Sequence, residues 1–472
     1  MLTSLSETIT TIVLAFLPFA AVLAVVLRKP YYIVELYVII ILMFTASAIG
    51  ASKELVLIYG RGSGVLPLPI INFFLIAVFG FFFCLRFFPS RKVKIKESFK
   101  PGNRLLLLFG FSIIYLLVGG ANGVPVNEVL SAKGIVNIVN MCLFVFILKW
   151  STESSDQLDG LVKVALWCLA ISAFYGIVRF LFLGGDPANS YGNELRVNVR
   201  LTYQDIGQSI LFGFAFGYST LKLLRRQFAG PREQAFFAAL ALLSVLNIFL
   251  SYRRNAWFGF IIVVIWLLLV VDLGKKMVLI TVATCMIIFL GGYVVAKRFT
   301  GQNIGGTKYT VTGDFSAQGG LSLKRGRFAE LWNASTDTLE RHPLFGFGPW
   351  GHYGSKYALY DLGKFAFFTH SAIVHVLMKT GLIGLFLFCW PFASLIFWMI
   401  TRRKTFPKNS KYMTLCDAAF GGFLFTIPEI LFATPVIIFR HLQITALFIG
   451  LMYCAYLFRD AQTNTGQYRS LS

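Results

Sequence analysis

A histidine followed by a serine, His370-Ser371, stands where a long polar interval of the sequence gives way to an apolar run. A histidine at a boundary between water and membrane can exchange a proton near neutral pH and serve as a general base. The alternative is a boundary histidine that only forms a hydrogen bond with a backbone group. Further along the same apolar run, the small residues Gly381 and Gly384 would let another helix approach closely.

Two adjacent arginines, Arg253 and Arg254, occupy a short polar turn, residues 252–255, between two apolar runs. Guanidinium groups bind phosphate oxygens through paired hydrogen bonds, so clustered arginines are suited to a phosphate or a diphosphate. The alternative for Arg254 is a side chain that extends from a helix end to lipid headgroups. The turn therefore predicts either an anion site or a membrane anchor.

The largest polar interval, residues 297–370, holds more basic residues and a glycine-rich stretch. We expect an amphipathic helix over 323–340, on which Arg325 and Arg327 either bind phosphate or belong to a solvated face. Arg341 is either a further phosphate contact or a helix-terminal residue. The glycines that follow are expected to form a turn whatever the function is, namely Gly346, Gly348 and Gly351.

The elements that must position these residues are membrane helices. Of the 472 residues, 57% are hydrophobic and 14% are charged, against about 45–50% and about 25% in soluble proteins. This composition excludes a soluble enzyme, a disordered chain and a disulfide-stapled secreted module. The apolar runs are continuous and of about membrane-spanning length, whereas the strands of an outer-membrane barrel alternate. They fall near 9–27, 31–49, 66–85, 104–120, 130–149, 161–183, 205–221, 235–251, 256–271, 276–296, 372–400, 413–432 and 441–458.

The orientation of these runs follows from their basic loops. Four alternate loops are rich in Lys and Arg, and such loops lie on the cytoplasmic side. The interval 297–370, the loop 184–204 and the turn 252–255 then fall on the extracytoplasmic side. Long loops escape this rule, but a short outside turn with two arginines requires a reason. The net charge of +22 thus has two parts. The basic residues of the four inside loops set the orientation of the protein in the membrane, and a separate group of basic residues lies outside. The charge therefore does not indicate that the protein binds nucleic acid. The four inside loops contain Arg86, Arg91, Lys92, Lys94, Lys96, Lys100 and Arg104; Lys222, Arg225, Arg226 and Arg232; Lys275 and Lys276; and Arg402, Arg403, Lys404, Lys408 and Lys411.

We therefore expect an all-α polytopic integral membrane protein with about 12–13 transmembrane helices and one large periplasmic loop that contains short helices. Residues 1–296 form an N-terminal transmembrane bundle, residues 297–371 form the large loop, and residues 372–472 form C-terminal transmembrane helices and a short cytoplasmic tail. The first apolar run lacks a basic leading segment, so it is expected to be a retained span.

Three stretches carry a resemblance to a known family. His370-Ser371, nine further residues and then Gly381-x-x-Gly384 resemble the motif of bacterial O-antigen ligases, which belong to a wider superfamily of O-antigen ligases and polymerases. The loop stretches 327–332 (Arg-Phe-Ala-Glu-Leu-Trp) and 343–351 (Pro-Leu-Phe-Gly-Phe-Gly-Pro-Trp-Gly) look like the family's loop signature.

The third stretch, Arg254-Asn-Ala-Trp257, resembles the family's short periplasmic turn. The family's arginine is often followed by glycine four positions on, whereas Gly259 lies five positions after Arg254. Either Arg253 or Arg254 could therefore be the matching residue, and we favour Arg254. The resemblance covers roughly residues 250–390, and the rest of the chain only through its pattern of spans.

The resemblance implies a multi-pass enzyme of the bacterial inner membrane with its active site facing the periplasm. It would transfer a glycan from undecaprenyl diphosphate to an acceptor hydroxyl, with inversion and without metal or other cofactor. Its partners would be the lipid-linked glycan, lipid A–core or a glycan acceptor, and membrane lipids. His370 would take the proton of the acceptor, and Arg254 and Arg327 would hold the diphosphate. Other substrate-binding residues would be Arg253, Arg325, Arg341, Trp257, Ser371, Gly346 and Gly348.

Two other functions remain open at this point. A polymerase would use a second lipid-linked repeat unit as the acceptor, and a transporter of lipid-linked sugar or anions would line its path with arginines. Glu429 lies within an apolar run, where a carboxylate is a functional candidate. Arg440 either adds to the basic surface outside or pairs with Glu429.

Overall fold

The computed structural model describes residues 29–44, 68–87, 100–187, 189, 200–293, 326–354, 367, 369–433 and 435–459. Within these ranges the chain forms helices and no strand, so the expected all-α class is confirmed. The first apolar run and Arg325 lie outside the described residues.

Every other predicted apolar run contains a helix. Before the large loop these are α2 (Tyr31–Met43), α4 (Ile70–Phe87), α5 (Lys100–Ala121), α6 (Val126–Val129), α7 (Val136–Ser151), α8 (Ser155–Phe182), α10 (Ile206–Leu224), α11 (Pro231–Phe249), α12 (Arg254–Val270) and α13 (Leu273–Met286), which continues as a π-helical turn (Ile287–Gly291). After it come α16 (Gly326–Arg341), α18 (Ala372–Arg402), a 3₁₀ turn (Arg403–Thr405), α19 (Lys411–Phe425), α20 (Ile427–Phe432), a second 3₁₀ turn (Pro435–Ile437) and α21 (Phe439–Leu457).

Helices are the expected solution for apolar runs because a bilayer offers no hydrogen-bond partner to the backbone. Large apolar side chains such as Phe174, Leu269 and Phe289 are exposed, as surface that faces lipid would be. Among the described residues, six helical segments are long and apolar enough to span a membrane: Pro101–Ala121, Ser155–Phe182, Pro231–Phe249, Leu273–Gly291, Ala372–Thr405 and Lys411–Phe432. Four shorter apolar helices accompany them: Tyr31–Met43, Ile71–Arg86, Val136–Ser151 and Arg254–Val270.

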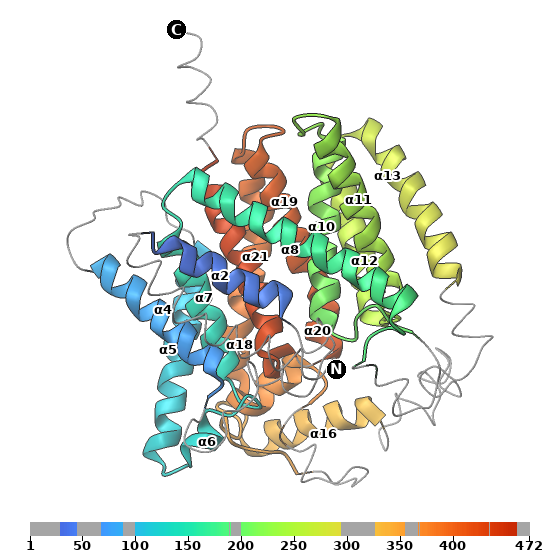
Figure 1. The fold of residues 1–472 in the computed structure, drawn as a ribbon. Coiled ribbons are helices and arrows are strands. Elements are labelled where there is room, and N and C mark those ends of the chain that lie inside the picture. The colour runs from blue at the N-terminus through green and yellow to red at the C-terminus, as the bar shows by residue number, and fades with distance from the viewer. Residues whose placement is uncertain are drawn as a thin grey trace.

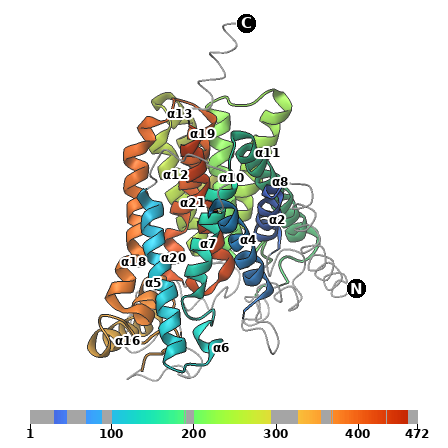
Figure 2. The same cartoon turned by 90° about the vertical axis from the view of Figure 1, so that its left-hand side faces the viewer.

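The helices run between two distinct ends of the molecule. Figure 1 shows α16, α6 and α20 at its lower end and the α10–α11 and α18–α19 connections at its upper end. The quarter-turn view of Figure 2 shows the same division, with α5 and α18 side by side. We refer to the end with α16 as the site end and to the opposite end as the basic end.

The basic end joins loops that are far apart in sequence. Asp417 of α19 forms ion pairs with Arg225, which follows α10, at 2.5 Å and with Arg403, which follows α18, at 2.8 Å. Asp272, before α13, pairs with Lys275 at 3.3 Å and with Lys408 at 4.0 Å. Three of the four basic loops therefore meet at one end of the bundle, as their common side in the sequence predicts.

The helix that begins with the arginine turn is held in the centre of the bundle. The ring of Phe425, at the end of α19, packs against Gly213 of α10 and Gly259 of α12, where an added Cβ would come within 2.3 and 2.4 Å of the ring. Because only glycine allows this approach, the three helices are fixed relative to one another. The first residue of α12 is thereby placed at the site end.

Candidate functional site

His370 lies at the site end, immediately before α18, and is bound by a glutamate from the large loop. Its Nδ1 is 2.7 Å from Glu330 Oε2, and its backbone N–H donates to Glu330 Oε1 at 3.0 Å. Glu330 belongs to α16 and its side chain is 7% exposed, whereas that of His370 is 33% exposed. The carboxylate is therefore buried behind the imidazole, and the imidazole reaches solvent.

This arrangement defines what the histidine can do. A carboxylate only accepts hydrogen bonds, so Nδ1 must be the donor, and in that neutral tautomer Nε2 carries the lone pair. A carboxylate on one ring nitrogen fixes the tautomer and the ring orientation and stabilises the imidazolium that forms when the other nitrogen takes a proton. The pair has the chemistry of an oriented general base.

The helix that carries Glu330 is fixed to α18 by a small apolar cluster. Ala334 of α16 packs with Met378 of α18 and with Tyr353 from the segment after α16. Burial, with the nearby charge of Glu330 as a second cause, raises the pKa of Tyr353, so this hydroxyl stays protonated at neutral pH. α16 is thus attached to the same helix that His370 precedes.

The glycine-rich turn after α16 attaches to an interruption in α18. Gly381 has φ 66° and ψ −166° within the helix, so the backbone groups around it lose their helical partners. The turn supplies replacements: Phe347 N–H donates to Met378 O at 2.8 Å, and Leu382 N–H donates to Pro343 O at 2.8 Å. Since buried backbone groups require partners, the turn and the interrupted part of α18 satisfy each other's backbone hydrogen bonds.

Gly381 differs in one respect from the sequence-based expectation. The expected neighbour of Gly381 and Gly384 was another helix, but a Cβ on Gly381 would meet the loop backbone of Leu344 at 2.3 Å. At Gly384 the nearest groups are Thr380 of the same helix and, at 3.1 Å, Phe111 of α5. The first glycine therefore accommodates the loop turn, and only the second faces a neighbouring helix.

The two candidate arginines of the turn have different surroundings. Arg253 Nη2 donates to the carbonyl of Gln204 at 2.6 Å, which ties the turn to the segment before α10. Arg254 is the first residue of α12 and is exposed. Tyr252, which precedes the two arginines, has φ 54°, so the chain reverses sharply here. Arg253 is thus bonded to the carbonyl of Gln204, and Arg254 is exposed at the site end.

A short helix connects the arginine turn with the histidine. Asn255 Nδ2 donates to Glu429 Oε1 of α20 at 3.0 Å, and Glu429 is buried. α20 packs against both α12, which begins at Arg254, and α18, which begins two residues after His370. Both groups therefore belong to the same end of the bundle, with α20 between their helices.

The remaining predicted site residues are distributed around this centre. Arg327 is in the first turn of α16. Arg341 forms a two-point ion pair with Asp337, with Nε–Oδ1 at 2.8 Å and Nη2–Oδ2 at 2.9 Å, and covers the ring of Phe347. Trp257 is half-buried against the core, Ser371 is the buried N-cap residue of α18, and Gly346 and Gly348 have φ of 66° and 86° in the turn.

Arg440 does not pair with Glu429, which settles one alternative left open by the sequence. Its Nη1 lies 2.5 Å from Asp205 Oδ2, and its Nε donates to the carbonyl of Ile41 at 2.7 Å. His441 Nε2 is 2.8 Å from the other oxygen of Asp205. Burial alone would raise the pKa of Asp205, but the charge of Arg440 and the hydrogen bonds hold it well below its usual range. This buried cluster joins α2, α10 and α21.

Glu330 is the candidate site residue that sequence reasoning did not identify. It stands within the 327–332 stretch quoted for its resemblance, but no role was assigned to it. Its position three residues after Arg327 was the available signal, because a helix places such residues on one side. Within the described residues, no group of three or more His, Cys, Asp or Glu side chains could hold a metal ion.

A comparison with protein families matches the stretch of chain that holds these residues. Residues 239–389, about a third of the chain, match the family model described as O-antigen ligase. This stretch contains the arginine turn, α16, the glycine turn and His370. The resemblance to the O-antigen ligase superfamily is therefore confirmed, and it supports a membrane enzyme of ligase or polymerase type. No curated protein matches the chain at a significant level.

Proposed function

We propose that this protein is a membrane glycosyltransferase that moves a glycan from undecaprenyl diphosphate to an acceptor hydroxyl on the periplasmic side of the bacterial inner membrane. The observation that carries the proposal is the His370–Glu330 pair, an oriented base at the end of the bundle opposite the basic loops. The acceptor is lipid A–core, which makes the protein an O-antigen ligase.

In the proposed reaction the acceptor oxygen attacks the anomeric carbon of the glycan from the face opposite the diphosphate. A new carbon–oxygen bond forms, the bond to the diphosphate oxygen breaks, and the configuration inverts. His370 Nε2 takes the hydroxyl proton, and undecaprenyl diphosphate leaves with the bonding electrons. Glu330 stabilises the imidazolium through the Nδ1 hydrogen bond.

The leaving group carries additional negative charge as the bond breaks, and guanidinium groups aimed at it lower the barrier. Arg254 is the first candidate for this role because it is exposed at the N-terminus of α12, where the helix dipole also favours an anion. Arg327 is the second, since it precedes Glu330 on α16. Arg253, Arg325 and Arg341 would add to the basic surface. No metal ion is required by this scheme.

A polymerase is the alternative within the same chemistry, with a second lipid-linked repeat unit as acceptor. The His-Ser and Gly-x-x-Gly motif favours the ligase. A transporter is the alternative of another class, but the candidate site residues lie at one end of the bundle and not near the membrane midplane, where transporters bind their substrates.

The test is a transfer assay with purified full-length protein, undecaprenyl-diphosphate-linked glycan and lipid A–core. We expect His370→Ala and Arg254→Ala each to abolish transfer and Lys92→Ala, in a basic loop, to retain it. Retained activity in both site variants would refute the site. Chain extension of the glycan without lipid A–core would replace the ligase by the polymerase, and absence of any transfer by the wild-type protein would favour transport.

A further inference from the structure

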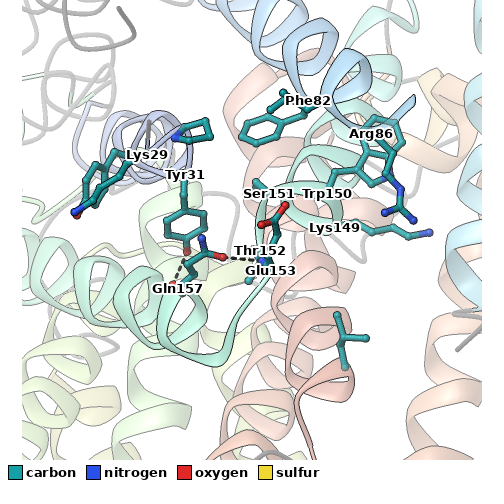
Figure 3. A pocket seen from close by; sticks show the side chains of 14 residues that line it. Lys29, Tyr31, Phe82, Arg86, Lys149, Trp150, Ser151, Thr152, Glu153 and Gln157 are labelled. Carbon is teal, nitrogen blue, oxygen red and sulfur yellow. Dashed lines mark hydrogen bonds between the residues drawn. The ribbon is translucent and has the colours of Figure 1, made fainter. Parts of the chain in front are cut away.

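A cavity lies at the basic end, away from the proposed active site. It has a volume of about 440 Å³ and opens between the first residues of α2 and α8 and the last residues of α4 and α7. α7 begins near the site end and its 16 residues span about 24 Å, so the cavity and His370 are on opposite sides of the bundle. Figure 3 shows the side chains that line it.

The lining of this cavity is basic. Of the described residues that form it, Lys29, Arg86 and Lys149 carry positive charge and Glu153 is the acidic one. Arg86 is near enough to Lys149 to repel it electrostatically, and Figure 3 shows their cationic groups side by side. Two like charges so close together favour an anion between or above them.

Lys149 differs from the other cations of the basic end. Arg225 and Arg403 share Asp417, and Lys275 pairs with Asp272. Lys149 is half-buried, and within the described part of the chain no carboxylate pairs with it; it lies 5.6 Å from the ring centre of Tyr453. Insertion topology explains why lysines gather on this side, but it does not explain a half-buried one without a counter-charge.

A hydroxyl group in the cavity wall is also without a partner. Ser151, two residues after Lys149, is 3% exposed, and its Oγ has no hydrogen-bond partner among the described residues. A buried hydroxyl that lacks a partner is unfavourable, and an anion oxygen would accept its hydrogen bond. Trp150, Tyr31 and Tyr32 complete the wall with aromatic rings, which prefer the boundary between lipid and water.

We propose that this cavity binds the phosphate group of an anionic phospholipid from the membrane leaflet on the basic side. Arg86 and Lys149 supply the charge, Ser151 donates a hydrogen bond, and the aromatic rings pack against the glycerol and the first methylene groups. A pocket of basic residues between helix ends, at the level of the headgroups, has the chemistry that recognises such lipids.

The test compares lipids on purified full-length protein in a neutral detergent, with thermal unfolding as the readout. We expect dioleoyl-phosphatidylglycerol to raise the unfolding temperature by several degrees, because a ligand of the folded state stabilises it. Dioleoyl-phosphatidylcholine and inorganic phosphate should each have little effect. Equal stabilisation by phosphatidylcholine would overturn the proposal, and so would stabilisation by inorganic phosphate to which the lipid adds nothing.

Variants assign the effect to this cavity. The double substitution Arg86→Gln/Lys149→Gln should abolish the stabilisation by phosphatidylglycerol. The matched control Arg402→Gln/Lys404→Gln removes the same charges from exposed positions at the same end and should keep it. If both double variants lost the stabilisation by phosphatidylglycerol, the effect would come from general surface charge at this end, and the proposal would be overturned. Should the first pair fail to fold, Ser151→Ala replaces it, with a partial loss expected and an unchanged response contradicting the site.

Discussion

The backbone of Gly346 lies directly against the backbone of Gly381. A Cβ atom on Gly346 would stand 2.6 Å from the nitrogen of Gly381, closer than real contacts allow. Gly346 follows the helix that carries Glu330, and Gly381 interrupts the helix that His370 precedes. The two members of the proposed base are therefore positioned through one backbone contact.

Gly381→Ala should destabilise the protein by at least about 1–3 kcal/mol, because its φ and ψ lie in a region that is essentially limited to glycine. The added methyl group would also overlap the carbonyl of Leu344. Thermal unfolding in detergent measures the loss, and transfer activity should fall with it. Gly110→Ala in α5 is the control, since nothing lies within 4 Å of its added Cβ. Equal unfolding temperatures for the two variants would contradict the proposal that the interruption of α18 at Gly381 requires glycine.

Glu330→Gln should reduce kcat for transfer by about 10²-fold, because the general base His370 contributes at least that much and depends on Glu330 to stabilise its protonated form. The amide keeps an acceptor for the Nδ1 hydrogen bond but cannot stabilise an imidazolium by its charge. The KM for the lipid-linked donor should change little, because Glu330 is buried behind His370. Glu340→Gln, an exposed position on the same helix, is the control and should retain wild-type kcat. If Glu330→Gln lowered stability but left kcat unchanged, Glu330 would have a structural role and no role in the reaction.

Asp205→Asn should cost about 3–5 kcal/mol of stability, because it leaves the buried guanidinium of Arg440 without its counter-charge. Chemical unfolding followed by tryptophan fluorescence measures this. Asp272→Asn breaks a surface pair with Lys275 and should cost no more than about 1 kcal/mol. Similar losses of stability in both variants would mean that the buried cluster at Asp205 does not hold the helices together more strongly than a surface ion pair does.

The same carboxylate predicts a dependence of stability on pH. The pKa of Asp205 is lower in the folded protein than the value of about 3.9 expected when unfolded. Its contribution is therefore fully present above that unfolded value and is lost as the pH falls below it toward the folded pKa. Melting curves at pH 6, 4 and 3 should show a steeper acid loss for the wild type than for Asp205→Asn. Equal losses of stability in the wild type and in Asp205→Asn would show that other groups control the loss of stability at acid pH.

The sequence was sufficient to predict the elements and to name most residues of the candidate site. Apolar runs located the helices because burial in lipid depends on composition alone, and the helix expected over 323–340 is α16 (Gly326–Arg341). The bond between His370 and Glu330 was not predictable, because the two residues are 40 positions apart and meet only through the attachment of the glycine turn to α18. The choice of Asp205 over Glu429 as the partner of Arg440 likewise depends on how α10 and α21 pack. Local pairs such as Asp337 with Arg341 follow from helical spacing and could have been found.

Because α18 is interrupted at Gly381, the number of helical residues between His370 and Gly381 determines both the direction of the His370 side chain and its position along the helix axis. Each residue of the intervening helix rotates the chain by about 100° and advances it by about 1.5 Å. One inserted residue would swing the imidazole about a quarter-turn away from Glu330. Four would nearly restore its direction but carry it about 6 Å along the axis, beyond the reach of a 2.7 Å hydrogen bond. The nine residues of the motif therefore fix an angle and a length together, which explains why this stretch of helix has a definite length.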